Sequence, residues 1–240
     1  IKKSLIHSLG SNFREVIIGG AALNAEVEAF FYKMKFPFTV GYGMTECAPL
    51  ISYDHHYNFV PTSCGSVLEG IMEARIDSPD PATIPGEIQV RGENVMKGYY
   101  KNPEATAATF TDDGWLKTGD SGVLKGRRLF IKGRIKTMIL SANGQNIYPE
   151  EIESRLNNLP YISESLVVLR GNRLVALVYP DTPAVHSDNI SSERLLEVMN
   201  DNKGILNKSV AQYERISEIH IVEKEFEKTP KKSIKRFLYS

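Results

Sequence analysis

The sequence predicts a mixed α/β and α+β fold, and three changes of pattern along the chain support this prediction. Up to about residue 60, short apolar runs that end in glycines flank a segment with helical spacing. Apolar and polar residues then alternate with period 2 from 64 to 131, and helical and strand patterns mix again afterwards. We therefore expect a partial α/β subdomain over 1–60, a β-rich, barrel-like subdomain over 61–135 and a small α+β domain over 136–240.

Two predicted strands in the α/β part each lead into a glycine-containing loop. The run 14–18 stops at Gly19-Gly20, a helical segment opens at Asn24, and the run 36–40 ends in Gly41-Tyr42-Gly43. Ligands of α/β sheets bind beyond the carboxyl ends of the strands. We therefore expect a ligand near these two loops.

The middle and last parts carry further local signals. Residues 72–76 and 88–90 alternate as antiparallel strands do, and Lys125-Gly126 separates two apolar runs as a hairpin turn would. In the last part, Pro149-Glu150-Glu151 predicts a helix start, since proline and acids suit the first turn.

Three more elements are expected in the last part. Gly171-Asn172 predicts a hairpin turn of type II′ between two strands. Ser191 is predicted to cap another helix, and 218–222 to form a strand.

Composition excludes several classes of protein. Lys+Arg and Asp+Glu number 29 each, so the net charge of +0 does not favour a nucleic-acid partner. No stretch approaches the ~18 apolar residues of a membrane-spanning helix, which leaves only peripheral membrane contact open. Cys47 and Cys64 are too few for a disulfide framework and lack metal-ligand spacing, so a cytoplasmic location is expected. The oligomeric state is not predicted.

The hexapeptide Gly41–Glu46 has the residue types of a nucleotide site. Tyr42 offers a flat face for a base, Thr45 a hydroxyl for a phosphate, and Glu46 a hard carboxylate for Mg²⁺. Glycines on either side of Tyr42 allow backbone to approach a ligand closely. Taken alone, the same residues fit a plain turn after a strand equally well.

Asp120 and Arg134 are two further candidate binding residues. Asp120 ends the string Lys-Thr-Gly-Asp and could accept both hydroxyls of a ribose; an Asx-type turn is the alternative. If Asp120 is reserved for ribose, we expect it to be exposed without ligand. Arg134 could fork onto a ribose or phosphate, while a solvated arginine between strands is the alternative.

Four strings in this order resemble the adenylate-forming superfamily, which comprises acyl-CoA synthetases, luciferases and peptide-synthetase adenylation domains. They are Gly-Gly-Ala-Ala-Leu at 19–23, Tyr-Gly-Met-Thr-Glu at 42–46, Lys-Thr-Gly-Asp at 117–120, and Gly-Arg-Ile-Lys to Pro-Glu-Glu-Ile-Glu at 133–153. The resemblance covers essentially the whole chain. The segments 92–104 and 146–149 look like the long-chain fatty acyl-CoA synthetase branch.

The resemblance implies an acid-thiol ligase that activates a fatty acid with ATP and Mg²⁺ to acyl-AMP and then transfers the acyl group to CoA, releasing AMP. It implies the following roles: Gly20 and Ala21 on one face of adenine, Tyr42 on the other, Thr45 at the α-phosphate, Glu46 at Mg²⁺, Asp120 with Arg134 at the ribose, and Lys136 at the hinge of a mobile C-terminal domain. Cys47, beside the loop, is interpreted as a packing residue.

The chain departs from the family pattern at two places. No Thr/Ser/Gly-rich phosphate-binding string precedes Ile17, so we expect this chain to be the later part of a longer enzyme, and its start at Ile1 suggests the same. Without that string, we expect the chain to be inactive by itself. The terminal segment 228–236 aligns Ser233 with the lysine that the family uses for adenylation, although Lys232 and Lys235 lie near.

Three alternatives to a fatty acid–CoA ligase stay open. The chain could belong to an enzyme that loads a carrier protein or uses a short or aromatic acid, because the acid-selecting wall is mostly outside it. Ser233 favours a non-catalytic nucleotide-binding module. The missing phosphate loop favours a structural piece without ligand affinity.

Overall fold

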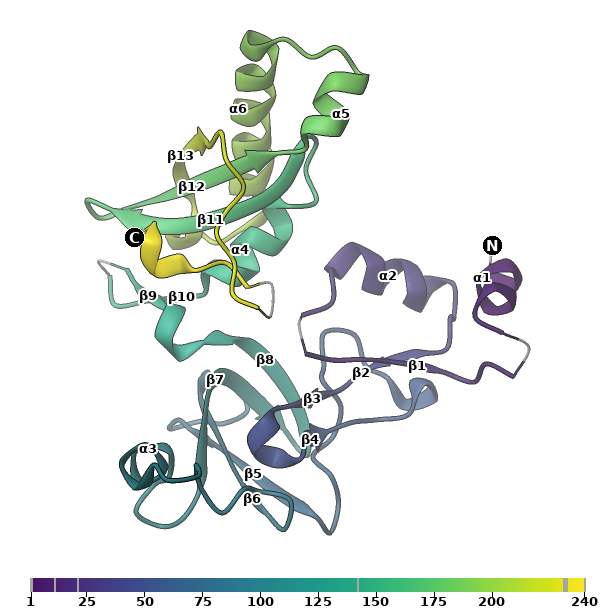
Figure 1. Ribbon diagram of the computed structural model, residues 1–240, viewed down its shortest axis with the longest axis vertical. Coiled ribbons are helices and arrows are strands. Elements are labelled where there is room, and N and C mark those ends of the chain that lie inside the picture. Colours follow the sequence, from purple (N-terminus) through teal and green to yellow (C-terminus); the bar gives the residue numbers. More distant parts are fainter. Residues whose placement is uncertain (1, 11, 21, 142, 231–232, 240) are drawn as a thin grey trace. The chain divides into compact units, whose positions relative to one another are not determined.

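A computed structural model describes residues 2–10, 12–20, 22–141, 143–230 and 233–239. The chain forms two compact units, Ile1–Lys136 and Thr137–Ser240, and Figure 1 shows helices and strands in both. The mixed α/β and α+β fold class is thereby confirmed. None of the helices in the described ranges combines the length and apolar character that crossing a membrane requires.

The first unit starts with a small α/β layer. Its elements are α1 (Lys2–Ser8), β1 (Val16–Ile18), α2 (Ala25–Lys33) and β2 (Phe38–Val40). β1 and β2 pair in parallel, as the run, turn, helix and run of the sequence predict. Asn24 caps α2 because its side chain accepts from the backbone N–H groups of Glu26 and Val27. Stacked and tilted phenylalanine rings, including Phe31–Phe36 and Phe38–Phe59, fill the core beneath this layer.

The predicted glycine-containing loop after β2 contains two short paired strands. β3 (Tyr42–Gly43) and β4 (Leu50–Ser52) pair antiparallel around the short helical turn η1 (Thr45–Cys47), and a second turn, η2 (His56–Asn58), follows. Gly43 is required by this packing, since a Cβ there would lie 2.0 Å from the Pro49 carbonyl oxygen. Glycine at position 43 therefore allows the main chain of β3 to lie close to the main chain at Pro49.

The β-rich part of the first unit is an open sheet. β5 (Met72–Asp77), β6 (Gly86–Gly92), β7 (Leu116–Lys125) and β8 (Arg128–Arg134) pair antiparallel in sequence order, and α3 (Pro103–Thr109) lies between β6 and β7 in the chain. The antiparallel strands were predicted, but the described residues do not close them into a barrel. Their inward residues, among them Ile88, Val90 and Leu129, form one core with Ile51.

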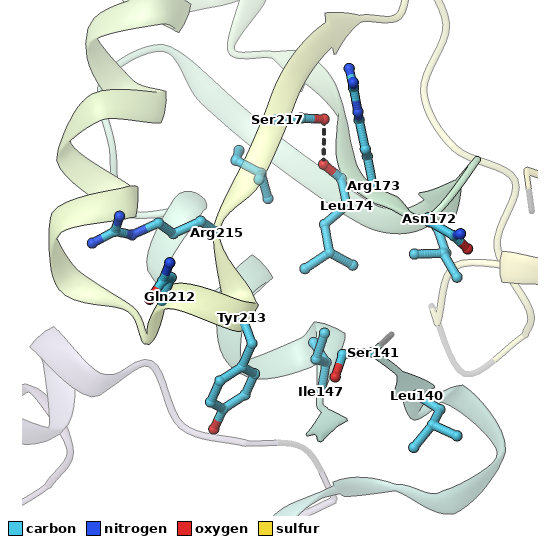
Figure 2. Close-up of a pocket in the computed structure, with 12 residues that line it drawn as sticks. Leu140, Ser141, Ile147, Asn172, Arg173, Leu174, Gln212, Tyr213, Arg215 and Ser217 are labelled. Carbon is cyan, nitrogen blue, oxygen red and sulfur yellow. Dashed lines mark hydrogen bonds between the residues drawn. The ribbon is translucent and has the colours of Figure 1, made fainter. Parts of the chain in front are cut away.

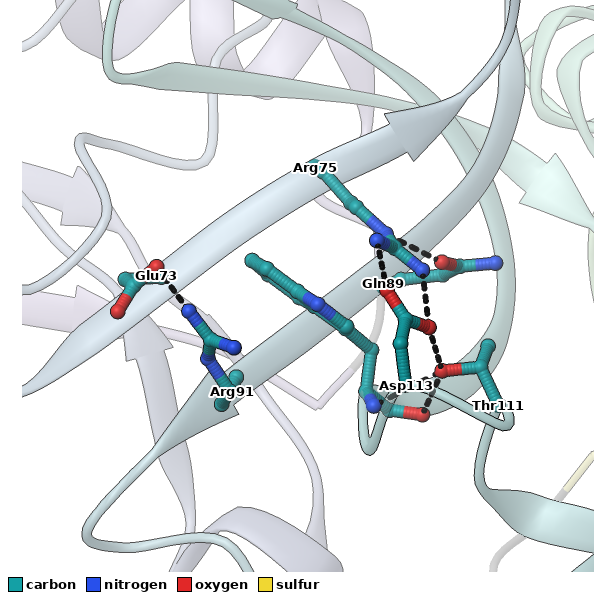
Figure 3. A network of polar contacts seen from close by, with 7 residues as sticks. Glu73, Arg75, Gln89, Arg91, Thr111 and Asp113 are labelled. Atoms are coloured by element: carbon teal, nitrogen blue, oxygen red, sulfur yellow. Dashed lines mark hydrogen bonds and ion pairs between the residues drawn. The ribbon is translucent and has the colours of Figure 1, made fainter.

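Trp115 contacts one arginine from each of the neighbouring strands β5 and β6. The guanidinium carbons of Arg75 and Arg91, which Figure 3 labels, each lie 4.6 Å from the centroid of the Trp115 ring. Asp113 accepts two bonds from Arg75, at 2.6 and 2.9 Å, and Glu73 accepts one from Arg91 at 2.9 Å. Two cations share one aromatic ring, so the network stabilises the pairing of β5 with β6.

The second unit packs helices on one face of a three-stranded sheet and the C-terminal segment on the other. Its elements are β9 (Ile139–Leu140), β10 (Asn146–Ile147), α4 (Pro149–Leu156), β11 (Ile162–Arg170), β12 (Arg173–Pro180), α5 (Thr182–Ser187), α6 (Ser192–Ser209), η4 (Gln212–Glu214), β13 (Ile216–Ile221) and η5 (Arg236–Leu238), after η3 (Ile135–Thr137) at the junction of the units. β12 pairs antiparallel with β11 and parallel with β13. Residues of α4 and α6 pack against one face, and Phe226, Ile234 and Tyr239 pack against the other. Figure 1 shows the C-terminal segment and α6 on opposite sides of this sheet.

The turn between β11 and β12 differs from the predicted type. Gly171 and Asn172 both have positive φ, +51° and +66°, which is the type I′ and not the type II′ pattern. Asparagine tolerates the left-handed region, so the Gly-Asn pair suits this turn well. Helices α1, α3 and α5 were not predicted, although Asn102 and Asp181 cap the latter two as sequence rules allow.

Candidate functional site

The two predicted glycine loops lie side by side at the carboxyl ends of β1 and β2. The Gly41 amide donates to the Ile18 carbonyl at 2.9 Å, and a Cβ on Gly19 would lie 3.3 Å from the Gly41 carbonyl oxygen. Gly20, with φ +83°, is exposed beside them. The neighbouring candidate Ala21 lies outside the described residues. The parallel pairing of β1 with β2 therefore brings together segments that are about twenty residues apart in the sequence.

Tyr42, Asp120 and Arg134 form a continuous chain of polar contacts. The Tyr42 hydroxyl donates to Asp120 Oδ2 at 2.7 Å, and Arg134 Nε lies 3.0 Å from Asp120 Oδ1. Tyr42 and Asp120 are buried, while the Arg134 side chain is 62% exposed. Burial, and then the negative charge of Asp120, raise the pKa of Tyr42, so this phenol stays protonated as a donor. Three residues chosen from sequence thus meet at one point.

An irregularity in β7 directs Asp120 toward Tyr42. Gly119 has φ +72°, and the five residues of β7 from Lys117 to Ser121 lie opposite only three of β6, from Gln89 to Glu87. The Thr118 hydroxyl donates to the Ile88 carbonyl at 2.8 Å and accepts from the Asp120 amide at 3.1 Å. The string Lys-Thr-Gly-Asp is therefore a bulged strand and not the alternative Asx-type turn.

The expectation that Asp120 is exposed without ligand is wrong. Asp120 is only 7% exposed, because Tyr42 covers one carboxylate oxygen and Arg134 lies against the other. A carboxylate oxygen has two acceptor positions, so a ribose hydroxyl could share these oxygens with the residues already bonded to them. The Arg134 side chain is exposed, but the buried Asp120 carboxylate holds its guanidinium in place. Arg134 is therefore more ordered than an arginine that only water surrounds.

Thr45 and Glu46 lie together on η1, and Tyr99 holds the glutamate. The Tyr99 hydroxyl donates to Glu46 Oε1 at 2.8 Å, and the Met96 amide donates to the Glu46 carbonyl at 2.7 Å. Thr45 is exposed and Glu46 is half-buried. Sequence reasoning missed Tyr99 as a site residue, although it stands in the segment 92–104 that carries part of the family resemblance.

The residues present fit a magnesium ion that binds together with phosphate. Glu46 supplies one hard carboxylate and Thr45 one hydroxyl, whereas the described residues contain no group of three or more His, Cys, Asp or Glu suited to a metal. Mg²⁺ in proteins is usually held by one or two carboxylates and by oxygens of a bound phosphate. The donor set therefore fits a metal that arrives with a nucleotide.

The cysteines behave as packing residues. Cys47 is 0% exposed, and burial raises the pKa of its thiol, and that of Cys64, to about 11. A thiol that stays protonated is a poor nucleophile. This agrees with the interpretation of Cys47 from the sequence.

Lys136 and Ser233 are the remaining candidate positions. Lys136 is exposed on η3 and is the last residue of the first unit. Ser233, in the second unit, is also exposed, and its amide donates to the Thr229 hydroxyl at 3.3 Å. Lys231 and Lys232 lie outside the described residues.

A hollow of about 370 Å³ lies elsewhere, within the second unit. Figure 2 shows Leu174, Ile147 and Tyr213 around it. No residue that the sequence singled out for nucleotide binding lines it. The size of a cavity is therefore a poorer guide to the site here than the convergence of Tyr42, Asp120 and Arg134.

Two family models match the chain. Residues 2–100 match the AMP-binding enzyme model, and residues 136–239 match the AMP-binding enzyme C-terminal domain model.

Individual relatives agree with these models. A protein named 4-coumarate–CoA ligase 2 from Solanum tuberosum is 33% identical over 237 residues, covering 92% of this chain and 42% of that protein. A solved structure of o-succinylbenzoate CoA synthetase from Bacillus subtilis with the acyl-adenylate OSB-AMP is 25% identical, with TM-score 0.78, covering 100% of this chain and 49% of that one. The same synthetase with ATP and magnesium ion is 26% identical, with TM-score 0.77, covering 98% and 49%. The chain thus spans less than half the length of these proteins.

Proposed function

Because the chain belongs to the adenylate-forming superfamily of AMP-binding enzymes, we propose that it carries the nucleotide site and the hinge of an ATP-dependent acid–CoA ligase. The enzyme would let the acid carboxylate attack the α-phosphate of ATP, forming acyl-AMP and releasing pyrophosphate, and would then let the CoA thiol displace AMP to form a thioester. The contact chain Tyr42–Asp120–Arg134 is the observation that carries this proposal.

The contact between Asp120 and Arg134 supports their proposed roles, and the other site residues complete the proposal. Asp120 and Arg134 would hold the ribose, the anion as acceptor and the cation as donor. The Tyr42 ring would flank adenine on one side, with Gly20 and Ala21 on the other. Lys136 would be the hinge between the units, at whose junction it stands.

The charge that builds on the α-phosphate would be offset at η1. Thr45 would donate its hydroxyl to this phosphate, and Glu46 would hold Mg²⁺ with the carboxylate that Tyr99 orients. The ion would supply a Lewis acid that polarises phosphate oxygens. Thr45 and Glu46 are consecutive residues on one turn, so both side chains can face one phosphate.

We assign the acid to the aromatic class. The sequence segments 92–104 and 146–149 led us to expect a long-chain fatty acid, but the relative reported above bears the name 4-coumarate–CoA ligase and the structural neighbour binds o-succinylbenzoyl-AMP. Both names denote aromatic acids. They support the aromatic alternative better than the fatty acid interpretation.

Nucleotide binding can be measured on the chain itself. Isothermal titration with AMP should give a saturable signal that Asp120→Asn weakens at least about tenfold, which corresponds to about 1.4 kcal/mol. Asp112→Asn, at an exposed aspartate of the same unit, is the matched control. Equal affinity in the Asp120 variant would contradict the ribose role.

The acid is tested with an active protein that contains this chain. Thioester formation should be faster with 4-coumarate than with palmitate, and faster with CoA than with a carrier protein. If AMP binds but no acid is activated, the second candidate holds, a non-catalytic nucleotide-binding module, which Ser233 in place of a lysine favours.

A further inference from the structure

In the C-terminal segment of the second unit, the described residues 227–229 and 233–235 pair antiparallel as the two arms of a loop. The Thr229 amide donates to the Ser233 carbonyl at 2.8 Å, and the Lys235 amide donates to the Glu227 carbonyl at 2.8 Å. The Lys235 ammonium also lies 3.2 Å from a Glu227 carboxylate oxygen. Ser233 is thus on the returning arm of this loop, three residues before Arg236.

Arg236 connects the end of the loop to α4. Its guanidinium forms an ion pair with Glu153 and lies 3.6 Å from Glu150 Oε1. The Glu153 side chain is only 10% exposed, and its other oxygen accepts from the Val167 amide of β11 at 2.6 Å. The carboxylate therefore joins the loop to both a helix and the central sheet.

Glu150 extends the same network to the first residue of the unit. The Thr137 hydroxyl donates to Glu150 Oε1 at 2.6 Å, and Thr137 directly follows the proposed hinge residue Lys136. One guanidinium thus faces two carboxylates. Removing it would take away the cation that both carboxylates face and would release the end of the loop from α4.

We propose that Arg236 is a positioning residue for adenylate formation: through Glu153 and Glu150 it holds the returning arm 233–235, and with it position 233, in a fixed place relative to the start of the unit. This inference rests on the proposed function, in which Lys136 is the hinge and position 233 aligns with the lysine that the family uses for adenylation. A loop tied to the residue beside the hinge would move with the unit as one body.

Hydrogen exchange tests the anchoring without reference to activity. In Arg236→Ala, the Thr229 and Lys235 amides that close the loop should exchange at least about tenfold faster, while amides between β11 and β12 keep their rates. Arg236→Lys keeps the positive charge but loses the planar guanidinium that can face two carboxylates, so it should give an intermediate exchange rate. This variant keeps the test informative if the alanine variant does not fold. Arg194→Ala, which breaks an exposed pair with Glu197 on α6, is the matched control.

The half-reactions test the positioning. In an active protein that contains this chain, Arg236→Ala should slow adenylate formation at least about tenfold more than thioester formation from supplied acyl-adenylate, and Arg236→Lys should restore part of the difference. Loop amides that keep their rates, or equal slowing of both half-reactions, would overturn the inference. Loss of nucleotide binding in the Asp120 variants bears only on the proposed function, so the two can fail separately.

Discussion

The Tyr42 hydroxyl donates to Asp120 across 78 positions of sequence, and both residues are buried. The bond orients the face of the Tyr42 ring and at the same time occupies part of the carboxylate beside it. The part of the site proposed for the base and the part proposed for the ribose are therefore mechanically coupled. A change at either residue should affect both.

Tyr42→Phe tests this coupling, because it keeps the ring and removes only the hydroxyl. The buried Asp120 oxygen loses its donor, so the free energy of unfolding should fall by about 1–3 kcal/mol. AMP affinity should fall as well, since the carboxylate is no longer oriented. Both are measurable by urea unfolding and calorimetry.

Tyr57→Phe is the control for this change, as Tyr57 is 70% exposed. It should leave stability and affinity unchanged. If Tyr42→Phe lowers neither, the hydrogen bond contributes nothing and the coupling is absent.

Gly43→Ala should destabilise the chain without any ligand present. The added Cβ would lie 2.0 Å from the Pro49 carbonyl oxygen, so β3 and β4 would have to separate. We expect a loss of at least about 2 kcal/mol in urea unfolding, typical of a steric conflict that backbone must relieve.

Gly204→Ala is the opposite case and a matched control. A Cβ on Gly204 meets nothing within 4 Å, and the residue is within α6, where alanine is favoured by about 1 kcal/mol. Equal effects of the two substitutions would show that Gly43 is kept for a reason other than packing.

Local signals explain how much of the fold could be predicted. Asn24 before an apolar helical segment and Gly126 between two apolar runs act through neighbouring backbone, so their elements were expected correctly. Alternation also predicted the antiparallel strands of the β-rich part, but it shows only which face of a strand is buried and not which strands pair at the sheet edges, so it could not distinguish a barrel-like sheet from an open one.

The candidate site was predictable to a similar extent. Motif strings identified Tyr42, Asp120 and Arg134, which the structure brings together, whereas their roles toward a nucleotide stay predictions. Tyr99 with Glu46 and Arg236 with Glu153 are 53 and 83 positions apart. Such pairs depend on tertiary packing, and no periodicity or spacing in one sequence indicates them.

Glu153 should make stability depend on pH in an unusual direction. Burial raises its pKa from 4.5 to about 7, against the opposing effect of the Arg236 charge, and nearby Glu150 adds to the rise. Between these two values the folded chain holds a proton that the unfolded chain has lost. The contribution of Glu153 to the free energy of unfolding therefore falls as pH rises from about 4.5 to about 7, with a slope of at most about 1.4 kcal/mol per pH unit.

Urea unfolding of the chain and of Glu153→Gln across this range isolates the contribution. The difference in unfolding free energy between the two proteins should shift steadily in favour of the glutamine variant as pH rises, and level off above about pH 7. A difference that is constant with pH would mean that Glu153 ionises normally in the folded chain. Glu151→Gln, on the same helix, serves as the control.

Ser233→Lys should accelerate adenylate formation in an active protein that contains this chain. The loop 227–235 places position 233 on an exposed, hydrogen-bonded arm, so a lysine there can extend without disturbing the core. An ammonium near the transferring α-phosphate acts where charge develops, and one such donor is worth about 10²–10³ in rate. Lys235 is a weaker candidate for this role, because Glu227 lies 3.2 Å from its ammonium and offsets its charge.

Ser187→Lys, which adds the same charge at an exposed position on α5, should change nothing. Adenylation measured by pyrophosphate release separates the outcomes: an unchanged rate in Ser233→Lys, together with lost adenylation in Lys235→Ala, would contradict this expectation and assign the role to Lys235.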